Sequence, residues 1–123
     1  MIKLTFCIRR LPQLSREEFF SYWHGHHAAL ARKNAKAMRV ARYVQLHALE
    51  DRINDVLRGS RKAPQGFDGV AEMWWPSREE MNKAFSTPEG KAAGKEMLAD
   101  EKNFIDLANS PIWLSEEHEM PID

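Results

Sequence analysis

The sequence predicts an α+β sandwich in which a four-stranded antiparallel sheet carries helices on one face. Three observations predict this fold class: alternating apolar residues at the start of the chain, two capping boxes that open helices, and an order of elements that reads strand, helix, strand, strand, helix, strand. The chain has 123 residues and no segment of different composition, so we expect a single domain over residues 1–123.

The first strand is predicted over residues 2–9, where apolar and polar side chains alternate. Ser15 and Glu18 then form a capping box, which predicts a helix from about Arg16 to about Ala37. At about 100° per residue, one stripe of this helix should face the sheet. The stripe consists of Phe19, Phe20, Trp23, His27 and Leu30.

A second strand is predicted over residues 39–49, and both of its faces could be covered. The alternation leaves open which sheet face Tyr43, Gln45 and His47 occupy. Residues 50–66 are expected to form a long connection with a short helical turn. Such a connection is either the rim of a binding site or a plain insertion.

The second half of the chain repeats this order of a strand followed by a capped helix and a further strand. A third strand is predicted over residues 69–75 before Pro76, and Ser77 with Glu80 forms the second capping box. Helical periodicity then resumes after Pro88 and runs to about residue 107, and residues 112–114 give a short final strand.

With right-handed crossovers, this order predicts a ferredoxin-like βαββαβ sandwich with both helices on one face of the sheet. The other sheet face would then carry aromatic and apolar residues that nothing in the chain covers. Pairing of two such faces would bury them, so we expect a homodimer.

The composition excludes several classes of function. Basic and acidic residues balance at 18 each, so no nucleic acid or anionic membrane is expected as a partner. The apolar start is too short for a signal peptide or a membrane span, which leads us to expect a cytoplasmic protein. The chain has no nucleotide fingerprint and no phosphate-cradling loop, and no cofactor is expected.

The helix carries the main candidate for chemistry, His27, inside its apolar stripe. Partial burial without a charged partner would lower the pKa of this histidine and keep it neutral, as a general base requires. The alternative is a core histidine whose ring nitrogens are satisfied by neighbouring groups. His24 and His26 fall beyond opposite margins of the stripe, so the three histidines are not expected to converge, and no metal site is expected.

Other candidate residues lie on the predicted strands. Tyr43 can orient a carbonyl or donate a proton to an enolate-like oxygen, or it can be a dimer-interface residue. Asp68 and Glu72 are possible acids, although such residues are more often solvated or paired. A substrate pocket, or else simply a core, would be lined by Phe20, Trp23, Gln45, Trp74, Trp75 and Phe85.

Four stretches of the sequence resemble the EthD domain family. The stretch from Arg9 to Leu30 resembles the opening of that domain, in which an aromatic–Trp pair, here Tyr22-Trp23, precedes a histidine, here His27. Three later stretches resemble the family's second strand, its third strand and the end of its last helix: residues 42–45, 68–74 and 100–106. The resemblance implies a dimeric α+β barrel.

The resemblance also implies relatives that handle hydrophobic ring compounds without a cofactor, including muconolactone-type isomerases and polyketide dehydratases or cyclases. In these relatives a helix histidine and a strand tyrosine line the pocket, which makes His27 and Tyr43 the expected catalytic residues here. The expected function is therefore a cofactor-independent lyase or isomerase, of the dehydratase or cyclase type, that acts by acid–base chemistry on a small hydrophobic aromatic, lactone or polyketide-like compound.

Two other functions stay open. The proteins that gave the EthD family its name accompany an ether-degrading oxidation system, so a non-catalytic binding or accessory protein for a hydrophobic metabolite is one alternative. A haem-handling or oxygen-using barrel is the other, because related ferredoxin-like dimers perform such chemistry and histidine ligates iron.

Overall fold

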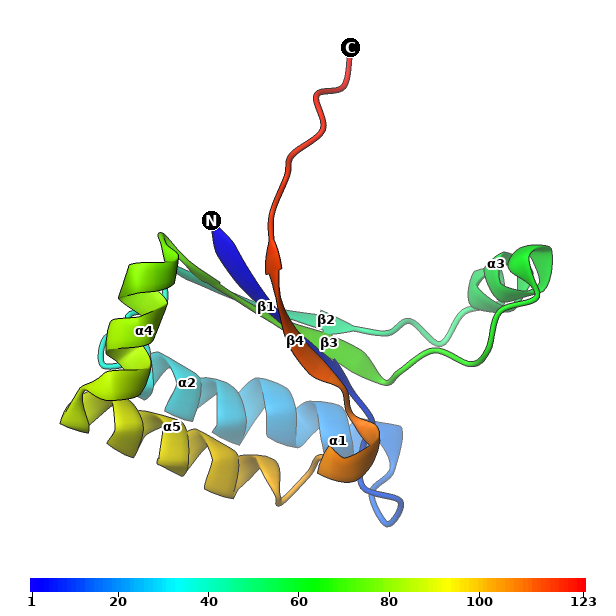
Figure 1. Ribbon diagram of the computed structural model, residues 1–123. Helices are drawn as coiled ribbons and strands as arrows, with labels where there is room; N and C mark the ends of the chain where they lie inside the picture. The colour runs from blue at the N-terminus through cyan, green and yellow to red at the C-terminus, as the bar shows by residue number, and fades with distance from the viewer.

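The computed structural model describes all residues, 1–123, as one sheet covered by helices on one face (Figure 1). The sheet has the order β2-β3-β1-β4, and its paired strands are antiparallel throughout. Its strands are β1 (Ile2–Ile8), β2 (Arg42–His47), β3 (Gly69–Trp75) and β4 (Ile112–Glu116). The predicted ferredoxin-like α+β fold is therefore confirmed.

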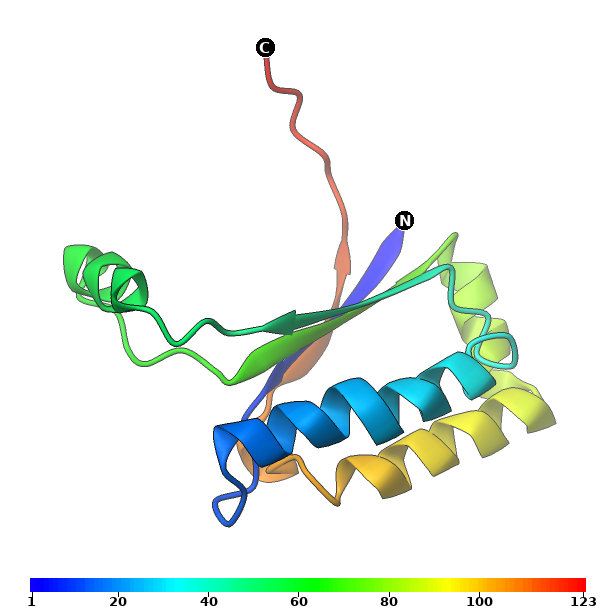
Figure 2. The same cartoon turned by 180° about the vertical axis from the view of Figure 1, so that it is seen from behind.

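Two helical segments cover one face of the sheet, and their longest helices lie side by side (Figure 2). The first is continuous and consists of α1 (Arg16–Tyr22), a π-helical turn η1 (Trp23–His27) and α2 (Ala28–Asn34). The second consists of α4 (Arg78–Ser86) and α5 (Pro88–Glu101), followed by a short 3₁₀ turn η2 (Leu107–Asn109). The sequence prediction placed a helix over the first segment but did not anticipate its π-helical turn.

Helices open at both predicted capping boxes, with the reciprocal pair of hydrogen bonds present at Ser15 and only the serine hydrogen bond present at Ser77. The Ser15 hydroxyl accepts a hydrogen bond from the Glu18 amide at 3.0 Å, and the Glu18 carboxylate accepts one from the Ser15 amide at 2.9 Å. The Ser77 hydroxyl accepts from the Glu80 amide at 3.2 Å. The first segment ends at Asn34, earlier than predicted, because the following turn reverses the chain through Arg39 in the left-handed region with φ 57°.

The strand register assigns each residue to a sheet face. Tyr43, Gln45 and His47 lie opposite Met73, Ala71 and Gly69, on the face that packs against the helices. Trp74 lies on the other face, because consecutive strand residues point to opposite sides. There Trp74 is buried under Lys3 and Arg42, and its indole donates to Glu117 at 2.9 Å.

The main core lies between the sheet and the two helical segments. It consists of Phe6, Ile8, Phe19, Trp23, Ala71, Phe104 and Ile105. The Trp23 indole lies so close to Gly69 that a Cβ at this glycine would stand 2.5 Å from a Trp23 ring atom. Gly69 therefore allows the first helix to approach β3 closely.

The connection between β2 and β3 forms an arm that stands away from the rest of the fold (Figure 1). Its helix α3 (Arg52–Arg61) replaces the short helical turn that the sequence predicted. None of its residues is buried, and its apolar side chains, Ile53, Val56 and Leu57, are exposed. None of the helices in the chain combines the length and apolar character needed to cross a bilayer.

Candidate functional site

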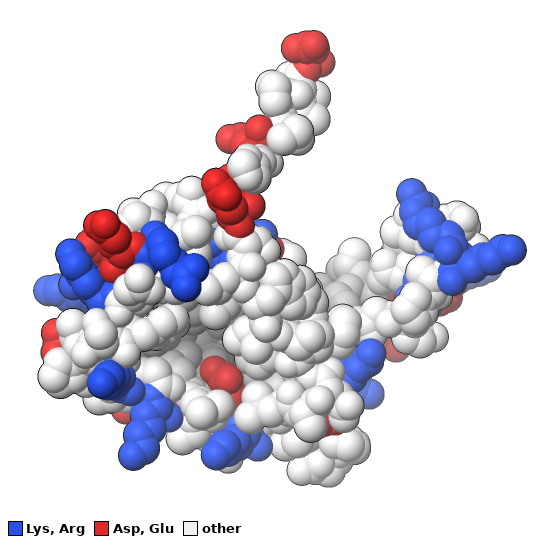
Figure 3. All heavy atoms as spheres, in the orientation of Figure 1, with Lys and Arg blue, Asp and Glu red and all other residues white.

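An apolar cavity of about 240 Å³ lies between the helix-facing side of the sheet and the helices. Figure 3 shows the surface hollowed where the helical layer meets β4. Thirteen of the sixteen residues that line the cavity are hydrophobic, so it suits a compound with little polar surface. Its ionisable side chains are His27 from η1, Tyr43 from β2 and Glu101 from the end of α5.

His27 holds a defined tautomer at the wall of this cavity. Its Nδ1 lies 2.7 Å from Oδ2 of Asp100, and both side chains are buried. An ionised carboxylate can only accept, so Nδ1 carries the proton and Nε2 keeps its lone pair. Nε2 has no hydrogen-bond partner within the chain and is the ring nitrogen left for a bound compound.

Trp23 and His27 lie in the π-helical turn, on the same buried side of the first helix. The amide of Ala28 bonds to the Trp23 carbonyl five residues earlier, which widens this turn. Both Trp23 and His27 are buried and line the cavity. Such turns occur often at functional sites, and nothing in the sequence signals one here.

Four polar groups surround the Asp100 carboxylate: the Tyr22 hydroxyl from α1, the His26 and His27 rings from η1, and the Asn103 amide from the turn after α5. The Tyr22 hydroxyl donates to Oδ1 at 2.6 Å, the Asn103 amide at 3.4 Å, and Nε2 of His26 lies 3.2 Å away. Burial opposes ionisation, but hydrogen bonds from Tyr22 and His27 lower the pKa of Asp100 overall, so it stays charged.

This arrangement corrects two expectations from the sequence. His27 has a charged partner, Asp100, although none was expected. His26 and His27 converge on that same carboxylate, whereas the helical geometry placed them apart. The physical reason is that the end of α5 lies beside η1, so that one carboxylate reaches both rings. No group of three or more histidine, cysteine, aspartate and glutamate side chains is placed to hold a metal ion.

Burial still controls the protonation of His27. Desolvation lowers the pKa of its imidazole, and the hydrogen bond and charge of Asp100 only partly oppose this effect. The ring is therefore neutral at pH 7 and able to accept a proton at Nε2.

Tyr43 is oriented by its neighbours on β2. Nε2 of Gln45 donates to the Tyr43 hydroxyl at 2.8 Å and to the Trp23 carbonyl at 2.9 Å. Because its oxygen accepts from Gln45, the Tyr43 hydroxyl can donate its own hydrogen toward the cavity. Burial raises the pKa of Tyr43, which keeps this hydrogen in place at neutral pH.

Glu101 is a cavity residue that the sequence analysis did not select. Its carboxyl lines the apolar space and forms no hydrogen bond or ion pair within the chain. Burial, together with the nearby charge of Asp100, raises the pKa of Glu101 to about 7. The only signal in the sequence was the resemblance of residues 100–106 to a family motif.

Only some of the residues predicted to bind substrate line the cavity. Trp23, Trp75 and Phe85 line the cavity, together with His27 and Tyr43. Gln45 donates to the Tyr43 hydroxyl, and Phe20 stacks on Trp23 with ring centres 6.4 Å apart, so both contact residues of the cavity wall without lining it themselves. Trp74 occupies the opposite sheet face.

The two carboxylates considered as acids, Asp68 just before β3 and Glu72 within it, are both paired. Asp68 accepts from the Arg10 guanidinium at 2.8 Å and from its amide at 2.9 Å. Glu72 forms an ion pair with Lys3. Neither of them lines the apolar cavity.

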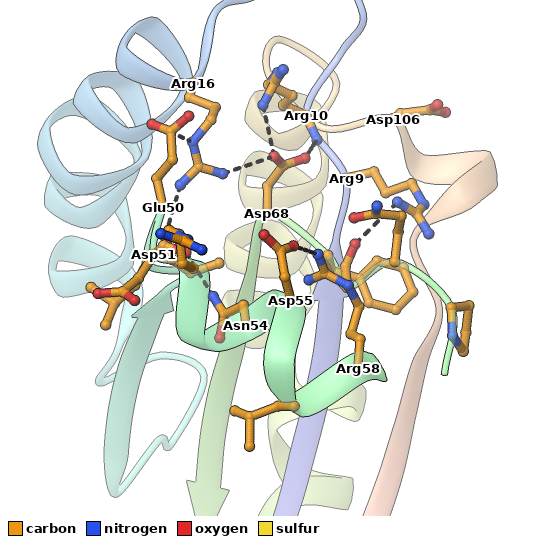
Figure 4. A pocket seen from close by; sticks show the side chains of 18 of the residues that line it. Arg9, Arg10, Arg16, Glu50, Asp51, Asn54, Asp55, Arg58, Asp68 and Asp106 are labelled. Carbon is orange, nitrogen blue, oxygen red and sulfur yellow. Dashed lines mark hydrogen bonds and ion pairs between the residues drawn. The ribbon is translucent and has the colours of Figure 1, made fainter. Parts of the chain in front are cut away.

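A second, polar cleft of about 1050 Å³ lies between the α3 arm and the end of β1 (Figure 4). Its charges are largely satisfied by one another: Arg10 and Arg16 both reach Asp68, and Arg58 pairs with Asp55. The cleft therefore offers few free charges for a ligand, and the apolar cavity is the better candidate site.

Comparison with known proteins identifies the family. The family model described as EthD domain matches residues 11–108, which is most of the chain. A solved EthD family protein from Bacillus halodurans is 20% identical, with a TM-score of 0.62 over 96% of this chain and 100% of that one. No curated protein matches the chain.

Two further structures share the fold at lower identity. A dimeric protein of ferredoxin-like fold and unknown function from Bacteroides fragilis is 11% identical, with a TM-score of 0.58 over 94% of this chain and 95% of that one. A protein described as a putative antibiotic biosynthesis monooxygenase from Deinococcus radiodurans is 12% identical, with a TM-score of 0.55 over 100% of this chain and 98% of that one. At these identities the likeness establishes the fold, while the match over residues 11–108 establishes the family: the chain belongs to the EthD domain family.

Proposed function

We propose that this EthD protein is a cofactor-independent lyase or isomerase that uses acid–base chemistry on a small hydrophobic aromatic, lactone or polyketide-like compound. One observation carries the proposal. The Asp100–His27 pair leaves the Nε2 lone pair of His27 at the wall of an apolar cavity that also receives the Tyr43 hydroxyl.

The chemistry follows from these three side chains. Nε2 of His27 removes a proton from a carbon next to a carbonyl group, and the Asp100 carboxylate stabilises the imidazolium that forms. The Tyr43 hydroxyl donates a hydrogen bond to the carbonyl oxygen, where negative charge develops. The apolar walls exclude water, which strengthens both electrostatic interactions.

The size and lining of the cavity support the proposed substrate class. A volume of about 240 Å³ is below the range of about 300–1,000 Å³ that is usual for ligand pockets, so a compound of one or two rings is the suitable guest. The indole rings of Trp23 and Trp75 offer flat apolar surfaces to such rings.

We also propose that the protein works as a homodimer through the sheet face that lacks helices. Leu46 and Trp113 lie on that face and are 47% and 48% exposed, which is a large apolar area for a free surface. The similar protein from Bacteroides fragilis is described as dimeric, which supports the same assembly here.

The acid–base proposal is tested with 5-nitrobenzisoxazole, a small bicyclic compound. A base removes its ring C–H proton, the N–O bond breaks, and a coloured cyanophenolate forms without any cofactor. The wild-type protein is expected to accelerate this reaction, and His27→Ala to lose about a hundredfold in rate.

His24→Ala is the matched control, because His24 is an exposed histidine of the same turn outside the cavity. It is expected to keep the wild-type rate. A wild-type rate equal to that of buffer, or equal rates for His27→Ala and the wild type, would remove the proposal.

A second candidate function is oxidation with molecular oxygen, or an accessory role in it. The description of the Deinococcus radiodurans protein as a putative monooxygenase favours this candidate. An oxygen electrode distinguishes the two functions. Oxygen uptake with an anthrone or naphthol that stops in His27→Ala supports oxidation, whereas the lyase or isomerase function consumes none.

A further inference from the structure

We propose that Glu101 is the proton donor of the cavity and that the reaction is the elimination of water from a β-hydroxy carbonyl compound. The proposal rests on the acid–base function of His27 and narrows it to one reaction class. It is carried by the placement of two neighbouring carboxyl groups, Asp100 and Glu101, in opposite environments.

The two carboxyl groups differ in every contact. Asp100 faces the first helical segment, where Tyr22, His26 and His27 all reach its oxygens. Glu101 faces the cavity and has no polar partner in the chain. One carboxyl is therefore fixed as a charged support for His27, while the other is free to exchange a proton with a bound compound.

The surroundings of Glu101 favour its protonated form. The ionisable groups that share the cavity are His27 from η1 and Tyr43 from β2, and no lysine or arginine lines it. Asp100, the neighbour on α5, adds a negative charge that raises the pKa of Glu101 further. Both neutral and ionised forms are therefore present near pH 7, which is the condition for a donor that is also regenerated.

The cavity has three side chains that can exchange or donate a proton, and this number favours elimination over isomerisation. A proton shift within one molecule needs a base that returns the proton and a donor to the carbonyl oxygen, and His27 with Tyr43 supplies both. A third group that exchanges protons has a role only if a second substrate atom must be protonated. A departing hydroxyl is such an atom, because hydroxide is a poor leaving group.

The step balances without a co-reactant. Nε2 of His27 takes the proton from the carbon between the carbonyl and the hydroxyl-bearing carbon, and the C–H electrons form the new C=C bond. The C–O bond to the hydroxyl breaks while Glu101 gives its proton to that oxygen, and water leaves. His27 ends as imidazolium and Glu101 as carboxylate, and solvent exchange moves the proton from His27 back to Glu101.

The test compares two probes in the same protein. A β-hydroxytetralone loses water to give a fluorescent naphthol and needs both a base and an acid. 5-Nitrobenzisoxazole releases a stabilised phenolate and needs only the base. Glu101→Gln is expected to lower the rate of naphthol formation by about a hundredfold. This loss of rate should be at least about tenfold larger than the loss that the same variant shows with 5-nitrobenzisoxazole.

The pH profile provides a readout that a packing defect would not change. In the wild type, naphthol formation is expected to fall as the pH rises through the pKa of Glu101, near 7, and Glu101→Gln should lack this fall. A carbon NMR titration of the Glu101 carboxyl, assigned from its absence in Glu101→Gln, gives the same pKa without turnover. Glu89→Gln, an exposed glutamate of the same helix, is the control for both measurements.

The outcomes separate this inference from the proposed function. If the wild type converts neither probe, the acid–base function itself fails. If it converts 5-nitrobenzisoxazole but not the hydroxytetralone, or if Glu101→Gln retains naphthol formation and the fall at high pH, only the role of Glu101 is overturned.

Discussion

Oδ2 of Asp100 lies 2.7 Å from Nδ1 of His27, and this bond joins the end of α5 to the π-helical turn of the first helix. The two residues are 73 positions apart in the chain. The bond fixes the histidine tautomer and places the free Nε2 at the cavity, so the chemistry of the site depends on how the two helical segments pack.

Asp100→Asn is expected to lower the rate with 5-nitrobenzisoxazole by about 10²–10⁴-fold. An amide can donate to Nδ1, which moves the ring proton to Nε2 and removes the base from the cavity. Asn103→Ala is the control, since Asn103 contacts Asp100 at 3.4 Å without touching His27, and it should stay within a few-fold of the wild type. Full activity in Asp100→Asn would show that the bond does not set the tautomer.

The raised pKa of Glu101 predicts that the free energy of unfolding falls as the pH rises. The native state holds the Glu101 proton up to about pH 7, while the unfolded chain releases it near the ordinary value of 4.5. The native state therefore binds more protons in this window, and about 2–3 kcal/mol of its stability is lost between pH 4.5 and 7.

Urea unfolding at a series of pH values measures this effect as the difference between the wild type and Glu101→Gln. His27 acts in the opposite direction, because its lowered pKa makes the unfolded state bind more protons below about pH 6.5. Taking the difference between the two proteins cancels that contribution. Parallel curves for the two proteins would contradict the raised pKa.

Gly69→Ala is expected to destabilise the fold by about 1–3 kcal/mol and to lower activity, because the new methyl group would collide with the Trp23 ring and with the Leu46 carbonyl oxygen on β2, which would distort the cavity wall. Gly66→Ala is the matched control, since a Cβ there meets no atom within 4 Å. Thermal unfolding measures the stability of both variants. Equal midpoints would mean that both the Trp23 ring and the β2 backbone at Leu46 accommodate the methyl group without cost.

Much of the fold could be predicted because its signals are local. The strand β3 begins and ends where the alternation and Pro76 placed it, and the predicted caps Ser15 and Ser77 both open helices. The same alternation also separates the two neighbouring tryptophans of β3. Trp74 and Trp75 are consecutive in a strand, so they point to opposite faces and only one of them can line the cavity.

The candidate site was only partly predictable because its decisive contacts are long-range. The position of His27 on the buried stripe followed from helical periodicity. Its partner Asp100 and the free carboxyl of Glu101 depend on where α5 ends beside η1, which no periodicity encodes. The π-helical turn likewise has no residue signature, so the convergence of His26 and His27 on one carboxylate could not be foreseen.

The dimer proposal predicts different effects for two equally exposed leucines. Leu46 and Leu98 are both 47% exposed, but Leu46 lies on the uncovered sheet face and Leu98 on α5 in the helical layer. A charge at Leu46 would be buried against the partner without a counter-charge, so Leu46→Glu should weaken association by at least about tenfold, or about 1.4 kcal/mol. Leu98→Glu should leave association unchanged.

Light scattering coupled to gel filtration, over a range of protein concentrations, measures this difference. The wild type and Leu98→Glu are expected to run at twice the 14.3 kDa chain mass, and Leu46→Glu at the chain mass when diluted. Circular dichroism confirms that each variant is folded. A wild type that stays at the chain mass at every concentration, or a weakening by Leu98→Glu as strong as that by Leu46→Glu, would contradict the sheet face as the interface. Leu46 and Leu98 match in residue type and exposure, so a difference between the two variants reports only on their place in the fold.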